Sequence, residues 1–532
     1  MILSVLHCLA AAAGCLLAAR ILLHYFQLES YQFPGYFRTL KRNLFKSLLP
    51  GVCMAVLTAI SLFALRRLIG CAWLRLAAAA VILAAGGYLT GKNCSEKHAK
   101  KAFVLTARVK RLYAVSAIVM TVVLRLAVFT AGETGTAADL AVILFPFFLP
   151  VWIALCGLLA WPVEKAISEM YFRDAQRILR ERKDLIKIGI TGSWGKTSVK
   201  FILGTILEEK YHTLVTPASF NTPMGVTKVI RSRLEPAHRI FVAEMGARHV
   251  GDIKEMCRLV HPQIGILTSV GPQHLDTFKT VERVAKTKYE LIDALPEDGE
   301  AFFADDGQIC AQLYEKTAIR KHLTGMNPDR NEVWAEEIRY SPEGSTFMLC
   351  TAGKRVSCTT QLLGELNIRN IVLCASVALS LGLSMDQIAR GIARIVPVEH
   401  RLQLIRHPGG PNVIDDAFNS NIRGAKQAFQ VLKQFPGKRM IITPGMVELG
   451  DREYEMNRDF GASMAGCCDI AVLVGRKRSE AIAAGLKENG FPEDSVRVVG
   501  SLEEATGVMR ELTGAGDTVL FENDLPDNYT ES

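Results

Sequence analysis

The fold of this chain is decided by the stretch Leu185-Ile-Lys-Ile-Gly-Ile-Thr-Gly-Ser-Trp-Gly-Lys-Thr-Ser198. Its pattern predicts a buried strand, a tight glycine turn and a helix that continues to about Lys210. Gly192 and Gly195 allow the backbone to approach an anion, and the helix directs its unpaired N–H groups toward it. Lys196 adds a positive charge. We therefore predict a phosphate-binding loop within an α/β domain, with Ser193 in the turn.

The loop departs from the commonest P-loop spacing. That spacing places a glycine five residues before Gly195, where this chain has Ile190. Either Thr197 or Ser198 would hold a Mg²⁺ ion beside bound phosphates. A strand-to-helix turn with a chance lysine is the alternative. The required order of strand, turn, lysine and hydroxyl favours the phosphate site.

The composition indicates a membrane part and a soluble part. Of the 532 residues, 49% are hydrophobic, which is a high share for a wholly soluble protein. Residues 1–162 contain 16 Lys and Arg against 4 Asp and Glu, whereas the remainder contains 46 basic and 49 acidic residues. This distribution argues against nucleic acid as a partner. The 13 cysteines form no C-x-x-C pair, so we expect neither a zinc site nor a disulfide framework.

Residues 1–162 are predicted to form a membrane domain of about five transmembrane helices. Each of five apolar runs is near the roughly 20 residues needed to cross a bilayer. The runs lie at about 2–19, 47–65, 71–90, 112–131 and 140–161. We expect the first run to be a retained helix, because no basic flank precedes it and no clear cleavage site follows. Pro162 is expected to end the last span, and residues 163–184 to form an amphipathic connecting helix.

The charges in the loops predict the orientation. The connections after the first and third runs are rich in Lys and Arg, which places them in the cytoplasm by the positive-inside rule. The fourth connection has Glu133 and Asp139 and no basic residue, although Arg66 and Arg67 in the second are a modest contradiction. Since the number of spans is odd, we expect a multi-pass protein of the plasma membrane whose α/β domains lie in the cytoplasm.

Two further strands bring polar side chains to the edge of the sheet where the phosphate loop lies. The run Ile240-Phe-Val-Ala-Glu244 ends in a carboxylate, and the strand that begins at Ile264 is followed by Gly-Pro-Gln-His274. Ligands bind at the carboxyl ends of strands in open α/β sheets, and a carboxylate there suits Mg²⁺.

The last part of the chain predicts a second, Rossmann-like α/β domain. Short apolar strands alternate there with helical stretches. The expected strands are Val413–Asp416, Met440–Thr443, Ile470–Val474, Val496–Val499 and Thr518–Glu522.

The stretch Thr191-Gly-Ser-Trp-Gly-Lys-Thr197 resembles the ATP loop of the Mur ligases, and the resemblance covers about residues 185–532. Enzymes of this family join amino acids or peptides to a cell-wall precursor through an acyl phosphate. The resemblance implies a central ATP-binding domain at 185–397, a closing domain at 398–532, and ATP and Mg²⁺ as cofactors.

The resemblance also assigns roles to residues of the central domain. Glu244, in a Glu-Met-Gly-Ala segment, and His274 would hold magnesium ions. Lys288 aligns with a carbamylated lysine of the family that is a further metal ligand, and Lys286 is its rival. Asn221, with Thr222 beside it, lies where the family has an asparagine-rich loop facing the phosphates and the acceptor.

Further matches concern the nucleotide and the closing domain. The segment Gly364-Glu-Leu-Asn-Ile-Arg-Asn370 matches a Gly-x-x-Asn-x-x-Asn element, so Asn367 and Asn370 would lie beside adenine, although Leu366 stands where many relatives have histidine. Arg401 and Asp416 would reach ATP when the domain closes. Asn419 matches the Asp-x-x-Asn segment and would contact substrate. Asn457 replaces an expected histidine.

Within the family, these segments are most similar to those of the ligases that add D-alanyl-D-alanine to UDP-MurNAc-tripeptide. Such ligases have an N-terminal domain that binds the uridine nucleotide, whereas this chain has apolar runs there. A ligase acting on a lipid-linked cell-wall or other polymer precursor is therefore an alternative. A membrane ATPase or sensor without ligase activity is another, but Glu244, His274, Lys288 and a closing domain together favour a ligase.

Overall fold

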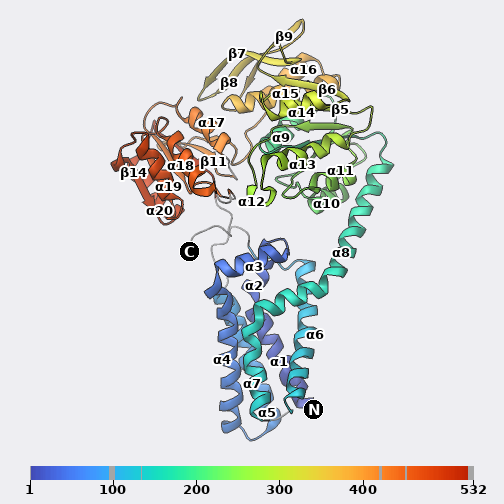
Figure 1. Cartoon of the computed structure of the whole chain (residues 1–532), viewed down its shortest axis with the longest axis vertical. Coiled ribbons are helices and arrows are strands. Elements are labelled where there is room, and N and C mark those ends of the chain that lie inside the picture. The colour runs from blue at the N-terminus through green and yellow to red at the C-terminus, as the bar shows by residue number, and fades with distance from the viewer. Residues whose placement is uncertain are drawn as a thin grey trace. The chain divides into compact units, whose positions relative to one another are not determined.

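The computed structural model describes residues 2–94, 102–132, 135–418, 422–447, 449 and 452–524. Contacts between residues divide the chain into a helical unit that ends at Glu169 and an α/β unit that begins at Met170. The α/β unit contains a nine-stranded and a six-stranded sheet (Figure 1).

The helical unit is built from apolar helices that pack along one another. They are α1 (Ile2–Ala18), α2 (Arg20–Leu28), α3 (Phe33–Arg42), α4 (Leu44–Leu68), α5 (Ala72–Asn93), α6 (Ala107–Thr130), α7 (Thr136–Leu144), the short 3-10 helix η1 (Phe145–Phe148) and α8 (Leu149–Glu181). Among the described residues, four helical segments are long and apolar enough to cross a membrane. A fifth results if α1 and α2, which meet at 51°, are taken as one span.

The last apolar run differs from its expected form. It is divided among α7, η1 and α8, with Pro146 in the first turn of η1. α8 continues through Pro162 to Glu181, so the expected last span and the expected connecting helix form one continuous helix. That the span ends at Pro162 stays a prediction. A proline inside a helix costs about 3 kcal/mol. Burial of Phe172, Ala175 and Leu179 beyond the proline offsets this cost.

The nine-stranded sheet has the order β2-β3-β1-β4-β5-β6-β7-β8-β9. Its strands are β1 (Ile186–Thr191), β2 (Thr213–Val215), β3 (Ile240–Glu244), β4 (Ile264–Leu267), β5 (Glu300–Ala304), β6 (Arg320–Gly325), β7 (Val333–Ser341), β8 (Gly344–Thr351) and β9 (Lys354–Thr360). The strands from β2 to β7 are parallel, and β7 to β9 form an antiparallel meander that the sequence did not predict. Because β1 lies between β3 and β4, the segments that follow these three strands meet at one edge.

Helices cover this sheet and form its core with it. They are α9 (Lys196–Leu207), α10 (Pro223–Arg233), α11 (Asp252–Val260), α12 (Leu275–Phe278), α13 (Val281–Asp293), α14 (Ile309–Lys316), α15 (Glu365–Ser380) and α16 (Met385–Ala393). One core cluster joins α9 and α15 to the sheet, and a second contains residues of α8, α11 and α13.

The six-stranded sheet has the order β10-β11-β15-β12-β13-β14, with only β10 antiparallel. Its strands are β10 (Gln403–Ile405), β11 (Asn412–Asp416), β12 (Arg439–Thr443), β13 (Ile470–Val474), β14 (Val496–Val499) and β15 (Thr518–Glu522). Its helices are α17 (Ile422–Leu432), α18 (Glu453–Met464), α19 (Ser479–Glu488), α20 (Leu502–Leu512) and the short 3-10 helix η3 (Glu493–Ser495). The five predicted strands and the Rossmann-like fold class are confirmed.

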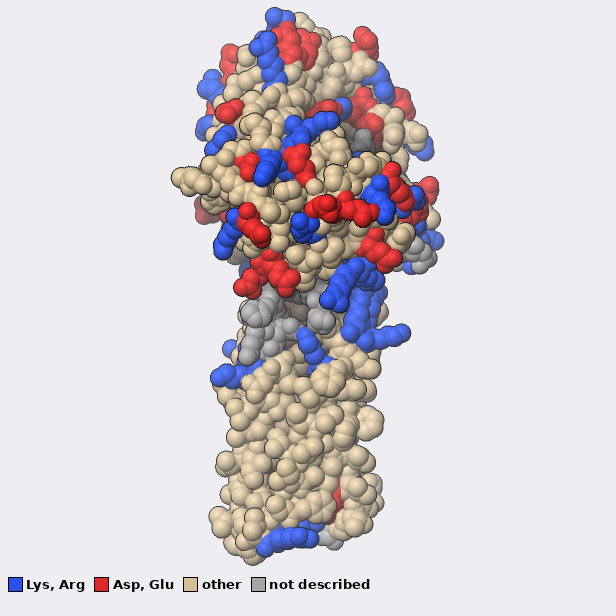
Figure 2. Space-filling view, turned by 90° about the vertical axis from the view of Figure 1, so that its left-hand side faces the viewer, with Lys and Arg blue, Asp and Glu red and all other residues tan. Residues whose placement is uncertain are grey.

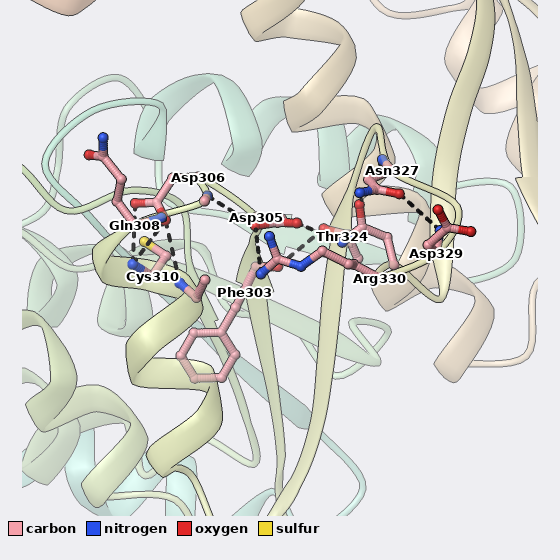
Figure 3. Close-up of polar contacts among 12 residues, drawn as sticks. Phe303, Asp305, Asp306, Gln308, Cys310, Thr324, Asn327, Asp329 and Arg330 are labelled. Carbon is pink, nitrogen blue, oxygen red and sulfur yellow. Dashed lines mark hydrogen bonds and ion pairs between the residues drawn. The ribbon is translucent and has the colours of Figure 1, made fainter.

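The turn after β5 fixes both α14 and α15. The carboxylate of Asp306 accepts the backbone N–H of Cys310 at 3.1 Å and so caps α14 (Figure 3). Asp305 lies 3.8 Å from the guanidinium of Arg330, and its carbonyl accepts a hydrogen bond from Arg369 of α15 at 3.2 Å. These contacts hold the first turns of α15 against the sheet.

Candidate active site

The phosphate loop connects β1 to α9 and has the geometry of an anion cradle. Gly192 and Gly195 take φ angles of 154° and 81°, which residues other than glycine rarely adopt. α9 begins at Lys196, so its first N–H groups follow the turn directly. The ammonium of Lys196 folds back and donates to the carbonyl oxygens of Gly192 at 2.7 Å and Ser193 at 3.2 Å. Thr197 lies partly buried in the first turn of α9.

The segment after β4 holds this loop in place. The buried hydroxyl of Ser193 donates to the carbonyl of Gly271 and accepts from its N–H, both at 3.1 Å. Ser269 accepts the N–H of Trp194 at 2.8 Å, and its carbonyl accepts the N–H of Ser193 at 2.9 Å. A Cβ at Gly271 would lie 2.3 Å from the indole of Trp194. The hydroxyl and N–H of Ser193 therefore fix the loop, and the assignment of Ser193 to the cofactor stays a prediction.

Glu244 is the last residue of β3 and lies in a buried network of hydrogen bonds. Its Oε2 accepts from the ammonium of Lys200 at 3.0 Å, and its Oε1 accepts from the amide of Asn221 at 3.0 Å. The side chains of Lys200 and Glu244 are 0% and 1% exposed. Burial by itself would raise the pKa of Glu244, but Lys200, Lys196 and Asn221 together lower it. The carboxylate is thus held in its ionised form.

Lys200 is a site residue that the sequence did not reveal. It also donates to the carbonyl of Ala218, and Ala218 and Asn221 both belong to the segment between β2 and α10. Lys200 therefore connects the phosphate helix to that segment and to Glu244. Its spacing of four residues from Lys196, which places both on one face of α9, was the available signal.

The structure distinguishes the two candidate lysines of α13. Lys286 is exposed, whereas Lys288 is 1% exposed. Burial, followed by the charge of Lys196, lowers the pKa of Lys288 well below its ordinary value, against the opposing charges of Asp252, Glu290 and Glu244. A lowered pKa favours the neutral amine, which is the form that reacts with carbon dioxide. The geometry therefore favours Lys288 over Lys286.

A pocket that is partly open to solvent gathers six of the expected residues. They are Gly195, Ser198, Asn367, Asn370, Arg401 and Asp416. Side chains that the sequence did not single out as site residues also line it, among them Trp194, Leu366 and Gln427. These residues come from the phosphate loop, the start of α15 and the second sheet, so the pocket is built from both halves of the α/β unit.

The two asparagines of α15 differ in their bonding. Asn367 donates to the carbonyl of Leu363 at 2.9 Å. The amide nitrogen of Asn370 is buried without a hydrogen-bond partner among the described residues. A native buried donor normally has a partner, so this amide in the pocket wall fits a bound ligand that supplies an acceptor.

Arg401 and Asp416 face the pocket from the second sheet. The guanidinium carbon of Arg401 lies 4.7 Å from the centre of the Phe418 ring. Burial lowers the pKa of Arg401, while nearby carboxylates, first that of Asp416, oppose the shift. Burial raises the pKa of Asp416 to about 6 despite the charge of Arg401, and its Oδ1 accepts the N–H of Leu402 at 3.0 Å.

The backbone around Arg401 is strained. His400 and Leu402, its neighbours on each side, take φ angles of 58° and 50°, which are uncommon for residues with a side chain. The imidazole of His400 lies 2.7 Å from a carboxylate oxygen of Asp415. The bonds of His400 and Leu402 to β11 compensate for this strain and fix the position of Arg401.

Two expected site residues, Thr222 and His274, do not line the pocket, and a third lies outside the described residues. Thr222 is exposed, and its hydroxyl caps α10 by accepting the N–H of Gly225 at 3.3 Å. His274 is partly buried at the start of α12 with a φ of 51°. Asn419 lies outside the described residues. The assignments of Thr222, His274 and Asn419 remain predictions.

The donor groups near the loop fit Mg²⁺ better than a softer metal. Within the described ranges there is no group of three or more His, Cys, Asp or Glu side chains able to hold a metal ion. Mg²⁺ does not need such a group, since it binds one or two carboxylates together with water and substrate phosphates. Glu244 supplies one carboxylate and Thr197 a hydroxyl. They would bind Mg²⁺ in partnership with the phosphates of a nucleotide.

Asn457, where a histidine was expected, has a structural role. It is fully buried on α18, accepts the N–H of Met446 at 2.8 Å and donates to its carbonyl at 3.1 Å. The side chain of Asn523 donates to the carbonyl of Gly445 at 2.7 Å. Together they fix the loop that follows β12.

Comparison with known proteins gives two family matches. Residues 190–378 match the Mur ligase middle domain, and residues 400–522 match the Mur ligase glutamate ligase domain. Similar curated proteins include the UDP-N-acetylmuramoyl-tripeptide–D-alanyl-D-alanine ligase of Escherichia coli strain K12, 30% identical over 60% of this chain and 72% of that protein. The ligase of that name from Bacillus subtilis strain 168 is 27% identical over 63% and 72%.

Solved structures agree with these matches. A crystal structure of MurF from Acinetobacter baumannii has a TM-score of 0.62 and 25% identity, covering 68% of this chain and 78% of that one. MurF from Thermotoga maritima in complex with ADP has a TM-score of 0.60 over 67% and 80% of the two chains, and at 23% identity it shows the fold alone. The α/β unit has this architecture, and the chain belongs to the Mur ligase family.

Proposed function

We propose that the protein is an ATP-dependent ligase that forms an amide bond through an acyl phosphate, and that it adds D-alanyl-D-alanine to UDP-MurNAc-tripeptide in peptidoglycan precursor synthesis. The observation that carries this proposal is the pocket between the phosphate loop, α15 and the Arg401–Asp416 segment. The two curated relatives have names that state this reaction. A substrate carboxylate would attack the γ-phosphate, and the amine would then displace phosphate from the acyl phosphate.

The residues of the phosphate side would bind ATP and orient its γ-phosphate. Lys196 would turn from the carbonyls of its own loop toward the phosphates and balance their charge. Asn370 would use its amide, which has no protein partner among the described residues, toward the nucleotide. Mg²⁺ would neutralise charge on the phosphates when bound by Thr197 and Glu244 and, by resemblance, His274.

The second sheet would supply the groups that complete the site. Arg401 adds a positive charge to the pocket wall, and Asp416 is within reach of that charge. Together they would hold the nucleotide and exclude water from the acyl phosphate, which hydrolyses if exposed.

Lys288 would carry a carbamate that replaces its positive charge by a negative one. Its burial and lowered pKa support the neutral amine that this reaction requires. The carbamate would then hold a magnesium ion beside the phosphates. Lys286 is exposed and does not offer this environment.

We place the helical unit in the plasma membrane, with the α/β unit in the cytoplasm. Four of its helical segments have the length and hydropathy of membrane spans. Figure 2 shows its flank as a band of uncharged surface with Lys and Arg side chains at the two ends. Arg66, which contradicted the expected orientation, forms a two-pronged ion pair with Asp139, whose Nη2–Oδ1 distance is 2.7 Å. This pairing reduces the weight of Arg66 as a topology signal.

A lipid-linked precursor is the second candidate substrate. The family matches begin at residue 190, so the helical unit lies outside them. A membrane unit would place the α/β unit beside lipid-linked cell-wall precursors. The partners would then be the membrane, a nucleotide- or lipid-linked precursor and a D-amino-acid dipeptide, and no nucleic acid.

The deciding experiment measures ADP release by the detergent-purified full chain with UDP-MurNAc-tripeptide and D-alanyl-D-alanine. A parallel reaction contains a lipid-linked precursor instead of the UDP-linked one. We expect turnover that requires both soluble substrates. Turnover only with the lipid-linked form would transfer the proposal to that precursor. ADP release that needs neither acceptor would refute the ligase and favour an ATPase or sensor.

A further inference from the structure

The helical unit contains a small cavity of its own that is partly open to solvent. Its wall combines aromatic side chains with an ionic group. The aromatic residues are Phe26, Tyr31, Phe33 and Trp161, and the ionic residues are Arg108 and Glu164. No part of the ligase reaction uses these residues, and the matched family domains do not include them.

The ionic part of the cavity has an excess of positive charge. Glu164 is 10% exposed and lies in a two-pronged pair with Arg111, at 2.5 Å and 2.8 Å. Arg108 lies farther from the same carboxylate, with its Nε 3.7 Å from Oε2. Two guanidinium groups therefore share one carboxylate, and the one that lines the cavity is the less tightly paired.

The guanidinium of Arg108 contacts an aromatic ring. Its central carbon lies 3.8 Å from the centre of the Tyr31 ring, which is a cation–π contact. The side chain of Arg108 is 36% exposed. A guanidinium that is partly open to solvent can bind a phosphate through two of its N–H groups.

The other walls are apolar. Phe26 is 2% exposed and packs on Phe33 with ring centres 5.5 Å apart. Gly157 of α8 allows this arrangement, because a Cβ there would lie 2.6 Å from Cε1 of Phe26. Leu112 and Trp161 complete the wall. A ligand bound at the open mouth of this cavity would contact a positive group and an apolar surface together.

The cavity lies where the apolar segments end. Arg108 is the second residue of α6, and Glu164 and Lys165 follow Trp161 on α8. Trp161 is 48% exposed and lies 5.0 Å from the ammonium of Lys165. Aromatic residues next to basic ones are typical of the boundary between the hydrocarbon core and the headgroups. This level matches the position of a lipid phosphate.

We propose that the open mouth of this cavity binds the phosphate of an anionic membrane lipid, with Arg108 as the phosphate ligand and the aromatic residues around it packing against the first part of the lipid chain. The proposal rests on the membrane location proposed above. It does not depend on which precursor the ligase uses.

The test measures lipid binding to the full chain directly. Protein purified in a neutral detergent is titrated with phosphatidylglycerol or with zwitterionic phosphatidylcholine, and bound lipid is counted by native mass spectrometry. Arg108→Gln removes the proposed ligand. Lys110→Gln is the matched control, because Lys110 is exposed on the same turn of α6 and does not line the cavity. Arg108→Lys keeps the charge but loses the planar fork.

We expect Arg108→Gln to weaken phosphatidylglycerol binding roughly 10- to 100-fold, the equivalent of one charge-assisted hydrogen-bonded contact. Lys110→Gln should change it less than about threefold, as expected for an exposed charge. Arg108→Lys should give an intermediate affinity. If Arg108→Gln fails to fold, as thermal unfolding would show, Arg108→Lys provides the comparison.

Three results would overturn the proposal. Equal binding of the two lipids would show no preference for a net anionic headgroup, and equal effects of the Arg108 and Lys110 substitutions would indicate diffuse surface charge. Inorganic phosphate that binds without lipid and displaces phosphatidylglycerol in an Arg108-dependent manner would assign the cavity to a free anion. ADP release with the soluble substrates should be unchanged in Arg108→Gln, so failure of the lipid site and failure of the ligase proposal are distinguishable.

Discussion

Replacing Lys200 by methionine tests the buried network beneath the phosphate loop. Methionine keeps most of the volume of the lysine stem but removes the ammonium that lies 3.0 Å from Glu244. Glu244 would then keep the hydrogen bond from the amide of Asn221. Removing one partner of a buried ion pair destabilises proteins by about 3–5 kcal/mol.

The size of the stability loss in Lys200→Met can be worked out from its dependence on pH. Without Lys200, Glu244 would be protonated in the folded state, and protonating a glutamate of ordinary pKa costs about 3.7 kcal/mol at pH 7 but only about 1 kcal/mol at pH 5. In the unchanged protein the pKa of Glu244 is lowered, so its favourable contribution is present above the unfolded pKa and is lost only as pH falls through the folded pKa. In the variant the pKa of Glu244 is expected to be raised instead, so the folded state loses stability as pH rises. The penalty should therefore differ by about 2.7 kcal/mol between pH 7 and pH 5.

The assay is thermal unfolding of the detergent-purified full chain, followed by tryptophan fluorescence in the presence of a chelator. For an α/β domain of this size, the midpoint should fall by roughly 7–15 °C at pH 7 and roughly 2–4 °C at pH 5. Lys210→Met is the matched control, since the ammonium of Lys210 donates to a neutral group, the carbonyl of Gly382, at 2.7 Å. Adding Glu244→Gln to Lys200→Met should restore much of the loss at pH 7, because no charge then remains buried.

An equal loss of stability at pH 5 and pH 7 would refute this reasoning, because it would show that packing rather than charge is what Lys200 provides. A Lys200→Met, Glu244→Gln double variant that is no more stable than Lys200→Met would contradict it independently.

Three further predictions concern the site. Since burial raises the pKa of Asp416 to about 6, kcat/KM for ATP should fall as pH drops below about 6, and Asp416→Asn should give low activity without this acid limb; an unchanged limb in the variant would contradict the assignment. Lys288→Ala should abolish ADP formation, short carboxylic acids should restore part of it, and Lys286→Ala should retain most activity; equal losses in both would refute the preference for Lys288. Gly271→Ala should raise the KM for ATP several-fold by displacing Trp194, whose indole lies 2.3 Å from the added Cβ position, whereas a normal KM would show that the loop adapts.

The sequence predicted most of the α/β fold because its signals are local. The apolar run before Gly192 and the five short strands of the second sheet lie where they were expected, since strand periodicity and flanking turn residues act over a few positions. The antiparallel meander β7–β9 was not predicted. Its strands pair with one another at the edge of a parallel sheet, and this long-range arrangement leaves little trace in local periodicity.

The candidate site was predicted only in part. The loop pattern identified Gly195, the family resemblance pointed to Asn370 and Arg401, and the tertiary fold places all three around one pocket. Lys200 looked like an ordinary helix lysine, and its importance arises only because β3 delivers Glu244 to the same place. The role of Ser193 was likewise decided by the segment after β4, which takes up its hydroxyl.

The sequence by itself determined the apolar runs, the phosphate loop and the order of strands and helices, because each depends on residues that are neighbours in the chain. Only the tertiary structure decided which charges are buried. It distinguished Lys288 from Lys286, joined Lys200 to Glu244 and placed Arg108 beside Tyr31 in a cavity. Burial and the distance between charges are properties of the folded chain, and they set the ionisation and the bonding of each group.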